Sequence, residues 1–298
     1  MDWRLILIGE NGPTPKQAER IAEALRATGA TLELISEGTG KTFPFPVLEV
    51  LDPQDRLDRA TIHQIAARLG TDVHIAARPS AECKLLVADM EATIIEDEML
   101  DLLADKRGIG PAVADITART MAGELDFSRS LKARTKLLAG TPESQLRELC
   151  GQIRYTPGAR TLVQTMRAAG AKTVLVTGGY DIFAQEVVRH CGFDEVVSNR
   201  PVLRDGVMTG ELHPPICNAQ TKREQLLRYC EELGIGPHSA CCVGDGANDV
   251  EMLQTCGLAV SYKGKSVVQK IVDLNITNGD LTAALYAQGF KAAQIADH

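Results

Sequence analysis

Two carboxylates and a hydroxyl follow a short apolar run near residue 89. The run is Leu-Leu-Val-Ala at 85–88, and Asp89, Glu91 and Thr93 come after it. An apolar run with a β-branched residue that ends in acids is typical of a buried parallel strand delivering polar side chains to a pocket. Because side chains two apart on an extended backbone point the same way, we expect Asp89 and Glu91 to share one cavity. Two acids in one cavity indicate paired chemistry.

Two weaker polar segments stand at other predicted element ends. Thr177 and Gly178 follow an apolar run and offer a hydroxyl and an amide without a side chain to an anion. A tight turn is the simpler interpretation of that segment taken alone. Lys222 stands near the start of a predicted helix, where a single lysine is usually a solvated surface charge. Each of these two segments indicates a function only in combination with the other polar segments.

The fourth segment is the most specific one. Residues 244–249 read Gly-Asp-Gly-Ala-Asn-Asp and directly follow an apolar strand, so Asp245 and Asp249 are four residues apart on a loop with two glycines. Glycine allows such a loop to turn sharply. Oxygen ligands on a loop of this kind suit Mg²⁺, which is often held by a few carboxylates together with a substrate phosphate. The segment therefore predicts a Mg²⁺ site.

The elements that position these segments alternate between strand and helix from residue 84 onward. The predicted strands are 84–88, 173–177, 195–199, 202–204, 207–209, 240–243, 258–261 and 272–276, with helices at 159–169, 181–190, 221–233 and 248–254. Such alternation predicts an α/β fold: a Rossmann-like parallel sheet with helices on both faces and the site beyond the carboxyl ends of the strands. The charged, helical block at 97–155 interrupts the alternation, so we expect it to form a cap over the site.

Residues 1–80 form a separate unit in this interpretation. Their apolar runs and helical stretches predict the order βαββαβ, with Arg78-Pro79-Ser80 as the linker to a second domain at 81–298. The order resembles the small ferredoxin-like α+β arrangement of ACT regulatory domains. Such a module can bind an amino acid or pair with a second copy as a homodimer. We favour a docking or stabilising role without a ligand, because no residue there is chemically distinctive.

Composition excludes several classes of function. The chain has 298 residues and a formal net charge of −7, and no basic cluster suited to nucleic-acid phosphates is visible. No run approaches the length of a membrane span, and the N-terminus does not read as a secretory signal, so we expect a cytoplasmic protein that contacts no membrane. The eight cysteines form no CxxC pair and no disulfide framework, and we expect them to be reduced and mostly buried.

Taken together in order and spacing, the four segments resemble the haloacid dehalogenase superfamily of aspartate-nucleophile phosphatases over residues 84 to about 285. The resemblance implies that Asp89 is the nucleophile and that Lys222 balances charge. It further implies the remaining roles: Thr177 and Gly178 bind the phosphoryl group, Asp89, Asp245, Asp249 and the main-chain carbonyl of Glu91 hold Mg²⁺, and Asn248 supports the site. Phosphoryl transfer depends on positioning and on neutralising oxygen charge, which Mg²⁺ and Lys222 would provide.

The predicted cap resembles the substrate-recognition elements of the phosphoserine phosphatases in that superfamily. The resemblance rests on Glu98 and on the segment 121–134, which contains Met121, Phe127 and Arg134. It implies that Glu98 binds the substrate ammonium and that Arg134 binds the substrate carboxylate through two parallel hydrogen bonds. It also implies that Met121 and Phe127 form an apolar wall of the site. Singly, the two charged residues would be ordinary exposed helix charges and the other two ordinary core residues. The implied reaction is hydrolysis of phosphoserine, a small phosphomonoester, to serine and phosphate.

The sequence departs from the superfamily at the second acid. Glu91 stands where the family has Asp, and Ala92 where it usually has Ser. That acid should protonate the leaving serine oxygen and then take a proton from the attacking water. The chemistry survives with Glu, but one methylene moves the carboxyl by about 1 Å, a misplacement that can cost about 100-fold in rate. Alternatives are transfer of the phosphoryl group to an alcohol such as homoserine, another small phosphomonoester, and a catalytically weak regulatory protein that binds phosphoserine.

Overall fold

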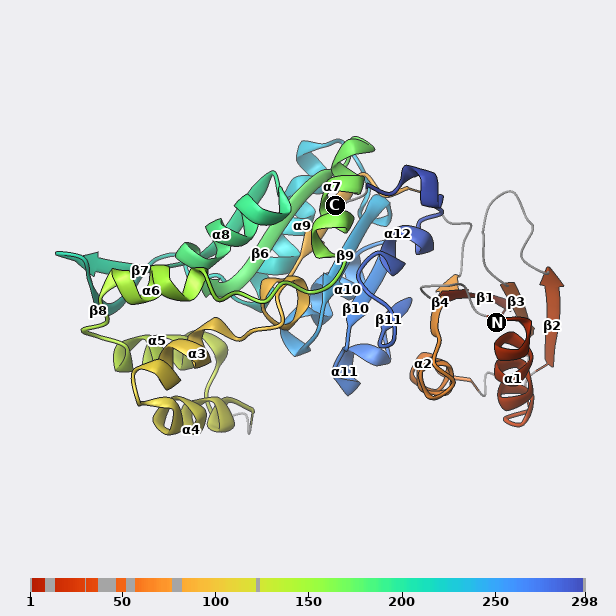
Figure 1. Cartoon of the computed structure of the whole chain (residues 1–298), viewed down its shortest axis with the longest axis horizontal. Helices are drawn as coiled ribbons and strands as arrows, with labels where there is room; N and C mark the ends of the chain where they lie inside the picture. The colour runs from red at the N-terminus through yellow and green to blue at the C-terminus, as the bar shows by residue number, and fades with distance from the viewer. Residues whose placement is uncertain are drawn as a thin grey trace.

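The computed structural model describes residues 2–8, 14–29, 31–36, 47–51, 57–76, 82–121 and 124–296. Its strands are β1 (Asp2–Ile8), β2 (Thr31–Ser36), β3 (Val47–Leu51), β4 (Asp72–Ala76), β5 (Leu85–Ala88), β6 (Lys172–Tyr180), β7 (Glu195–Arg204), β8 (Val207–His213), β9 (Ala240–Gly244), β10 (Leu258–Tyr262) and β11 (Leu274–Ile276). They form one 11-stranded sheet in the order β2-β3-β1-β4-β11-β10-β9-β5-β6-β7-β8 (Figure 1).

The middle of this sheet, from β11 to β7, is parallel. Its central strands β5 and β9 are buried along their whole length because both of their faces are covered. In β5, Leu85 and Val87 belong to the core on one face, whereas Leu86 and Ala88 belong to the core on the other. The predicted parallel α/β sheet is thus confirmed. The two segments predicted at 195–199 and 202–204 form one continuous strand, β7, which pairs with β8 as an antiparallel hairpin.

Helices cover both faces of the parallel strands. One face packs against α7 (Ala159–Ala168), α8 (Asp181–Cys191) and α12 (Ala283–Ala287). The other packs against α9 (Ala219–Glu232), α10 (Val250–Thr255) and α11 (Ser266–Gln269). The helices after β5, β6 and β9 therefore all begin near the carboxyl edge of the sheet, where the predicted site residues stand.

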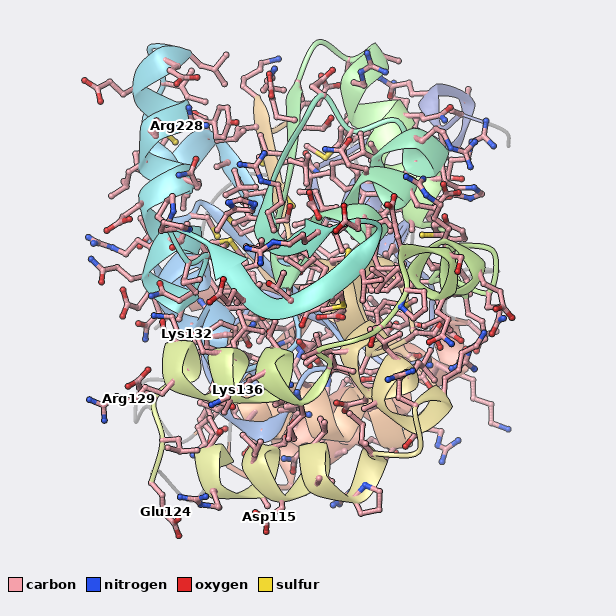
Figure 2. All side chains as sticks on the ribbon, turned by 90° about the vertical axis from the view of Figure 1, so that its left-hand side faces the viewer. Asp115, Glu124, Arg129, Lys132, Lys136 and Arg228 are labelled. Carbon is pink, nitrogen blue, oxygen red and sulfur yellow. The ribbon has the colours of Figure 1, made fainter. Side chains whose placement is uncertain are left out.

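The insertion between β5 and β6 consists of α3 (Met99–Lys106), α4 (Gly110–Met121), α5 (Phe127–Leu137) and α6 (Glu143–Cys150). Its entry and exit are clamped together, because Ile95 pairs with Tyr155 and the carboxylate of Asp97 accepts hydrogen bonds from the Arg154 guanidinium. A second attachment joins the loop before α6 to β8, where Gly140 N donates to Met208 O at 2.9 Å. Figure 2 shows α4 and α5 below the curved β7–β8 hairpin, with Asp115 and Glu124 toward the outer edge.

The N-terminal strands continue the same sheet. With α1 (Pro15–Arg26) and α2 (Arg59–Arg68) they follow the order βαββαβ, and β2-β3-β1-β4 is antiparallel. The helices cover one face and form a separate apolar core with it. On the opposite face Ile6, Ile8 and Ala76 belong to the main core of the larger domain, and α12 lies against β1. The N-terminal strands are therefore packed against the rest of the chain on an apolar face.

The junction between the two units is a strand pair supported by charge. In β4 and β11, His74 lies opposite Leu274, and Ile75 N donates to Asp273 O at 2.7 Å. The buried carboxylate of Asp72 accepts hydrogen bonds from three successive backbone amides at 277–279, at 2.7 to 3.0 Å. Arg59 forms an ion pair with Asp273 at 2.8 Å. The predicted linker, 78–80, lies outside the described residues, and the domain boundary there stays a prediction.

In the described ranges no helix combines the length and the apolar character that crossing a bilayer requires. Seven cysteines are free thiols: Cys150, Cys191, Cys217, Cys230, Cys241, Cys242 and Cys256.

Candidate active site

Asp89 occupies the end of β5, where the chain leaves the sheet. Its side chain is buried, and its Oδ1 accepts a hydrogen bond from Met90 N at 2.7 Å. The strand stops at Ala88, and the next residues, Met90–Ile94, form a tight turn in which Ala92 has a left-handed φ of 52°. A residue with a Cβ is uncommon in that region, so the turn is strained. The strand alternation that we expected to align Asp89 with Glu91 therefore does not extend past Asp89.

Lys222 is the electrostatic centre of the site. It is buried on α9, and its Nζ lies 2.7 Å from Asp89 Oδ2 and 2.7 Å from Asp249 Oδ1. Burial alone would lower the pKa of Lys222, but the two carboxylates raise it above its ordinary value. Burial raises the pKa of Asp89, and the ammonium of Lys222 opposes that rise. Lys222 is thus a permanent cation between two acids and not the solvated surface charge that a lone lysine usually is.

The loop after β9 presents Asp245 and fixes Asp249. The fully buried Asp249 accepts hydrogen bonds at its Oδ2 from the backbone amides of Asp245 and Gly246, both at 3.1 Å. A Cβ at Gly244 would lie 2.4 Å from Asp249 Cγ, so only glycine fits there. Asn248 Nδ2 lies 3.4 Å from Asp89 Oδ2, which ties the loop to the end of β5.

Three of these carboxylates form a candidate metal centre. Oxygen atoms of Asp89, Asp245 and Asp249 lie within 4.8 Å of one another, and all three residues are buried. Converging carboxylate oxygens are the donor set that a hard divalent cation requires, so the residues fit such an ion. Both oxygens of Asp249 already accept hydrogen bonds from protein donors, whereas Asp245 has one oxygen in an ion pair with Lys265 at 2.8 Å.

The last residues of β6, where its pairing register with β7 shifts between Val176 and Tyr180, bring Thr177 and Gly178 to the same edge. Thr177 is buried, and its Oγ1 accepts a hydrogen bond from Gly179 N at 2.9 Å. A Cβ at Gly178 would lie 2.6 Å from Phe127 Cζ, and one at Gly179 would lie 2.8 Å from Met90 Cε. Side chains therefore pack closely against both glycines, and neither has a positive φ.

Glu91 is held by the first helix of the cap. Its Oε1 accepts a hydrogen bond from Met99 N, the first amide of α3, at 2.9 Å. Its Oε2 lies on the other side, 3.2 Å from where a Cβ at Gly179 would stand. Burial raises the pKa of Glu91 to about 8, and the charges of Glu98 and Asp89 add to the rise. The Glu91 side chain, one methylene longer than aspartate, is therefore held beside the site by the N-terminus of α3.

The four residues predicted from the cap are only partly brought together. Phe127 begins α5 and lies over Gly178. Arg134 is on the same helix, and its Nε is a buried donor without a partner among the described residues. Glu98 is exposed at the start of α3. Met121 ends α4, but its side chain lies outside the described part of the structure.

Two residues at the site escaped the sequence analysis. Asn199, at the middle of β7, is fully buried and uses its whole amide: it donates to Gly178 O and Cys217 O and accepts from Cys217 N. It links the end of β6, beside Thr177, to the segment that leads into α9 and Lys222. An asparagine within an apolar strand was the available signal. Lys265 is the second, and a lysine in a Lys-Gly-Lys turn gave no such signal.

Comparison with known proteins places these observations in a family. The model of haloacid dehalogenase-like hydrolases matches residues 86–254. The chain is 35% identical over 201 residues to the phosphoserine phosphatase of Lactococcus lactis, which covers 67% of this chain and 93% of that protein.

Two crystal structures resemble nearly the whole chain. The first is a haloacid dehalogenase family hydrolase from Salmonella enterica serovar Typhi, with a TM-score of 0.81 and 26% identity over 96% of this chain and 98% of that one. The second is a probable phosphoserine phosphatase from Vibrio cholerae, with a TM-score of 0.76 and 26% identity over 96% of this chain and 86% of that one. With Asp89, Lys222 and the loop at 244–249 gathered at one edge of a parallel sheet, this chain belongs to the haloacid dehalogenase-like hydrolases.

Proposed function

We propose that this protein is a Mg²⁺-dependent phosphoserine phosphatase, which hydrolyses O-phospho-L-serine to L-serine and phosphate. The observation that carries the proposal is the buried ammonium of Lys222, shared at 2.7 Å by Asp89 and Asp249. A carboxylate held in this way, beside a divalent-cation site, is suited to attack phosphorus. The similarity to curated phosphoserine phosphatases supports the choice of substrate.

The chain's own residues account for each step. Asp89 attacks phosphorus and forms an aspartyl-phosphate as the bond to the serine oxygen breaks. The Thr177 hydroxyl, the Gly178 amide and Lys222 hold the phosphoryl oxygens, and protonated Glu91 gives its proton to the departing serine oxygen. Glu91 then takes a proton from the water that hydrolyses the aspartyl-phosphate, which releases phosphate and restores Asp89.

A divalent cation supplies the remaining charge. We propose that Asp89, Asp245 and the main-chain carbonyl of Glu91 hold Mg²⁺, which would neutralise the phosphoryl oxygens. Asp249 would support the metal site without binding the ion, because both of its carboxylate oxygens already accept hydrogen bonds from Lys222 and from the loop at 245–246. This assigns Asp249 a supporting role in the site.

The cap supplies the groups that recognise an amino acid. The Arg134 Nε donor is buried and without a described partner, which suits a substrate carboxylate, since an unpaired buried donor is costly otherwise. Glu98 at the start of α3 would receive the substrate ammonium. Phe127 closes the wall over Gly178. A zwitterion with a phosphate group would thus find one partner for each of its three charges.

Phosphate release from L-phosphoserine, with Mg²⁺ or with a chelator, tests this proposal. The native chain should release phosphate only with the metal, and Asp89→Asn, which keeps the shape of the side chain, should not. Glu96→Gln, on the adjacent exposed loop, serves as the matched control and should remain active. Binding of phosphoserine without Mg²⁺-dependent release would favour the regulatory alternative. Loss of phosphoserine without free phosphate, when homoserine is present, would favour transfer to an alcohol.

We also propose that the enzyme works in the cytoplasm. Six of the eight cysteines are buried and the sequence has no CxxC pair, which suits a reducing compartment.

A further inference from the structure

Lys265 lies at the metal side of the site, although no motif marks it. It stands at the start of α11, just after β10, and its Nζ forms an ion pair with Asp245 Oδ2 at 2.8 Å. Its backbone amide also donates to the backbone carbonyl of Asp245 at 2.8 Å. A Cβ at Gly246 would lie 3.4 Å from the same Nζ, so the ammonium rests directly on the loop. Main chain and side chain of Lys265 thus hold one and the same residue.

The turn that presents Lys265 is itself fixed from β11. The carboxamide oxygen of Asn275 accepts hydrogen bonds from Ser261 Oγ at 2.7 Å and from Gly264 N at 3.1 Å. A Cβ at Gly264 would lie 2.6 Å from Ser261 Oγ, so the turn packs tightly against β10. Gln269 Nε2 donates to Gly264 O at 2.7 Å and closes the turn from α11. Lys265 is therefore a preset group and not a freely moving surface lysine.

The two lysines of the site divide the acids between them. Lys222 contacts Asp89 and Asp249, and Lys265 contacts Asp245. Partial burial lowers the pKa of Lys265, but the hydrogen bond and charge of Asp245, with Glu98 and Asp249 behind it, raise the pKa above its ordinary value. Lys265 is thus a cation that faces both the metal loop and the start of the cap.

We propose that Lys265 is a positioning residue for the metal site: by donating to Oδ2 of Asp245 it orients that carboxylate and presents Oδ1 to the divalent cation. This inference rests on the metal site of the proposed function. Residues that orient metal ligands from outside typically change metal affinity about 10- to 100-fold when they are replaced.

A second cation near a metal also has an opposite effect, because like charges repel. The structure indicates which effect is larger. The Lys265 side chain is 55% exposed, so water screens its charge, whereas the Asp245 side chain that it orients is 9% exposed. Orientation of a buried ligand should therefore outweigh screened repulsion, and loss of Lys265 should weaken Mg²⁺ binding.

Calorimetric titration of the metal-free full chain with Mg²⁺ tests the inference without any substrate. Lys265→Met should bind Mg²⁺ about 10-fold more weakly than the native chain, or worse. Lys265→Arg, which keeps a donor, should recover most of the affinity. Lys270→Met is the matched control, since Lys270 is an exposed residue at the end of the same helix, and it should bind as the native chain does.

Unchanged or tighter Mg²⁺ binding in Lys265→Met would overturn the inference, because orientation of Asp245 would then not outweigh the charge repulsion. Thermal unfolding with a chelator shows whether each variant is folded, and Lys265→Met should unfold close to the native temperature since its side chain is largely exposed. The metal titration is independent of the substrate. If phosphoserine is not hydrolysed but Lys265→Met still binds Mg²⁺ more weakly, the proposed function fails while the role of Lys265 stands.

Discussion

Shortening Glu91 to aspartate, the residue that related phosphatases carry, should slow this enzyme. Glu91 Oε1 accepts a hydrogen bond from Met99 N, the first amide of α3, at 2.9 Å. Removing one methylene withdraws the carboxyl by about 1 Å, which takes that contact beyond the length of a hydrogen bond. Since a misplacement of about 1 Å can cost about 100-fold, we expect kcat of Glu91→Asp to fall about 100-fold, or about 2.7 kcal/mol in activation free energy.

The assay is steady-state phosphate release from L-phosphoserine at saturating Mg²⁺. KM should change little, because Glu91 acts on the leaving oxygen and not on the three charges that bind the substrate. Glu96→Asp makes the same shortening on the neighbouring loop, where Glu96 is only a distant partner of Arg154 at 3.7 Å, and its kcat should be native. If Glu91→Asp were as fast as the native chain or faster, the hydrogen bond to Met99 would not position the acid, and the reasoning would be wrong.

Three further changes have outcomes that the structure sets. Arg134→Met should lower kcat/KM for phosphoserine about 10- to 100-fold, the value of a charge-assisted hydrogen bond, and should leave kcat/KM for p-nitrophenyl phosphate almost unaffected. The control is Lys132→Met, which changes an exposed residue of the same helix (Figure 2). Equal losses on both substrates would contradict the role of Arg134. Asn199→Ala leaves the backbone of Gly178 and Cys217 without its buried partners, so urea unfolding should show a loss of at least about 3 kcal/mol, and a loss below 1 kcal/mol would refute that role. Burial lowers the pKa of His63 to about 4 and that of His74 to about 3, so the unfolded chain takes up protons first as the pH falls below about 6.5, and stability present above that pH is lost toward pH 4. His74→Leu should reduce the slope of unfolding free energy against pH between 6 and 5 by about 1.2 kcal/mol per pH unit, and an unaltered slope would contradict the assignment.

The sequence predicted which residues gather at one edge of the sheet better than it predicted how they are oriented there. Asp89 and Asp245 directly follow β5 and β9, and Thr177 lies near the end of β6. These three strands lie side by side and parallel, so the positions at one edge follow from strand order alone. The place of Glu91 does not follow, because it depends on the turn at 90–94 and on a left-handed residue, Ala92, whose small side chain gives no warning of it. A sequence pattern reports which residues end a strand, but not how the chain bends after it.

Two other features were beyond the reach of local patterns. The role of Lys265 depends on Asn275, which holds its turn from the next strand, and each residue alone reads as an ordinary polar position. The union of β4 with β11 joins segments about 200 residues apart, and either segment alone reads as a common short strand. Hydrophobic periodicity reports that a strand is buried and is silent about its neighbour in the sheet.

The junction of β4 and β11 also sets an order of events during synthesis. About 200 residues separate Ala76 from Ile276, so at ribosomal speeds of about 5–20 residues per second the edge of β4 emerges about 10–40 s before the strand that covers it. Until then Asp72 lacks the three backbone amides that donate hydrogen bonds to it in the folded protein. Ile6 and Ile8 likewise lack the main apolar core that buries them. An open strand edge beside an apolar face is a site for wrong pairing. The nascent chain thus depends on its last strand to protect its first ones.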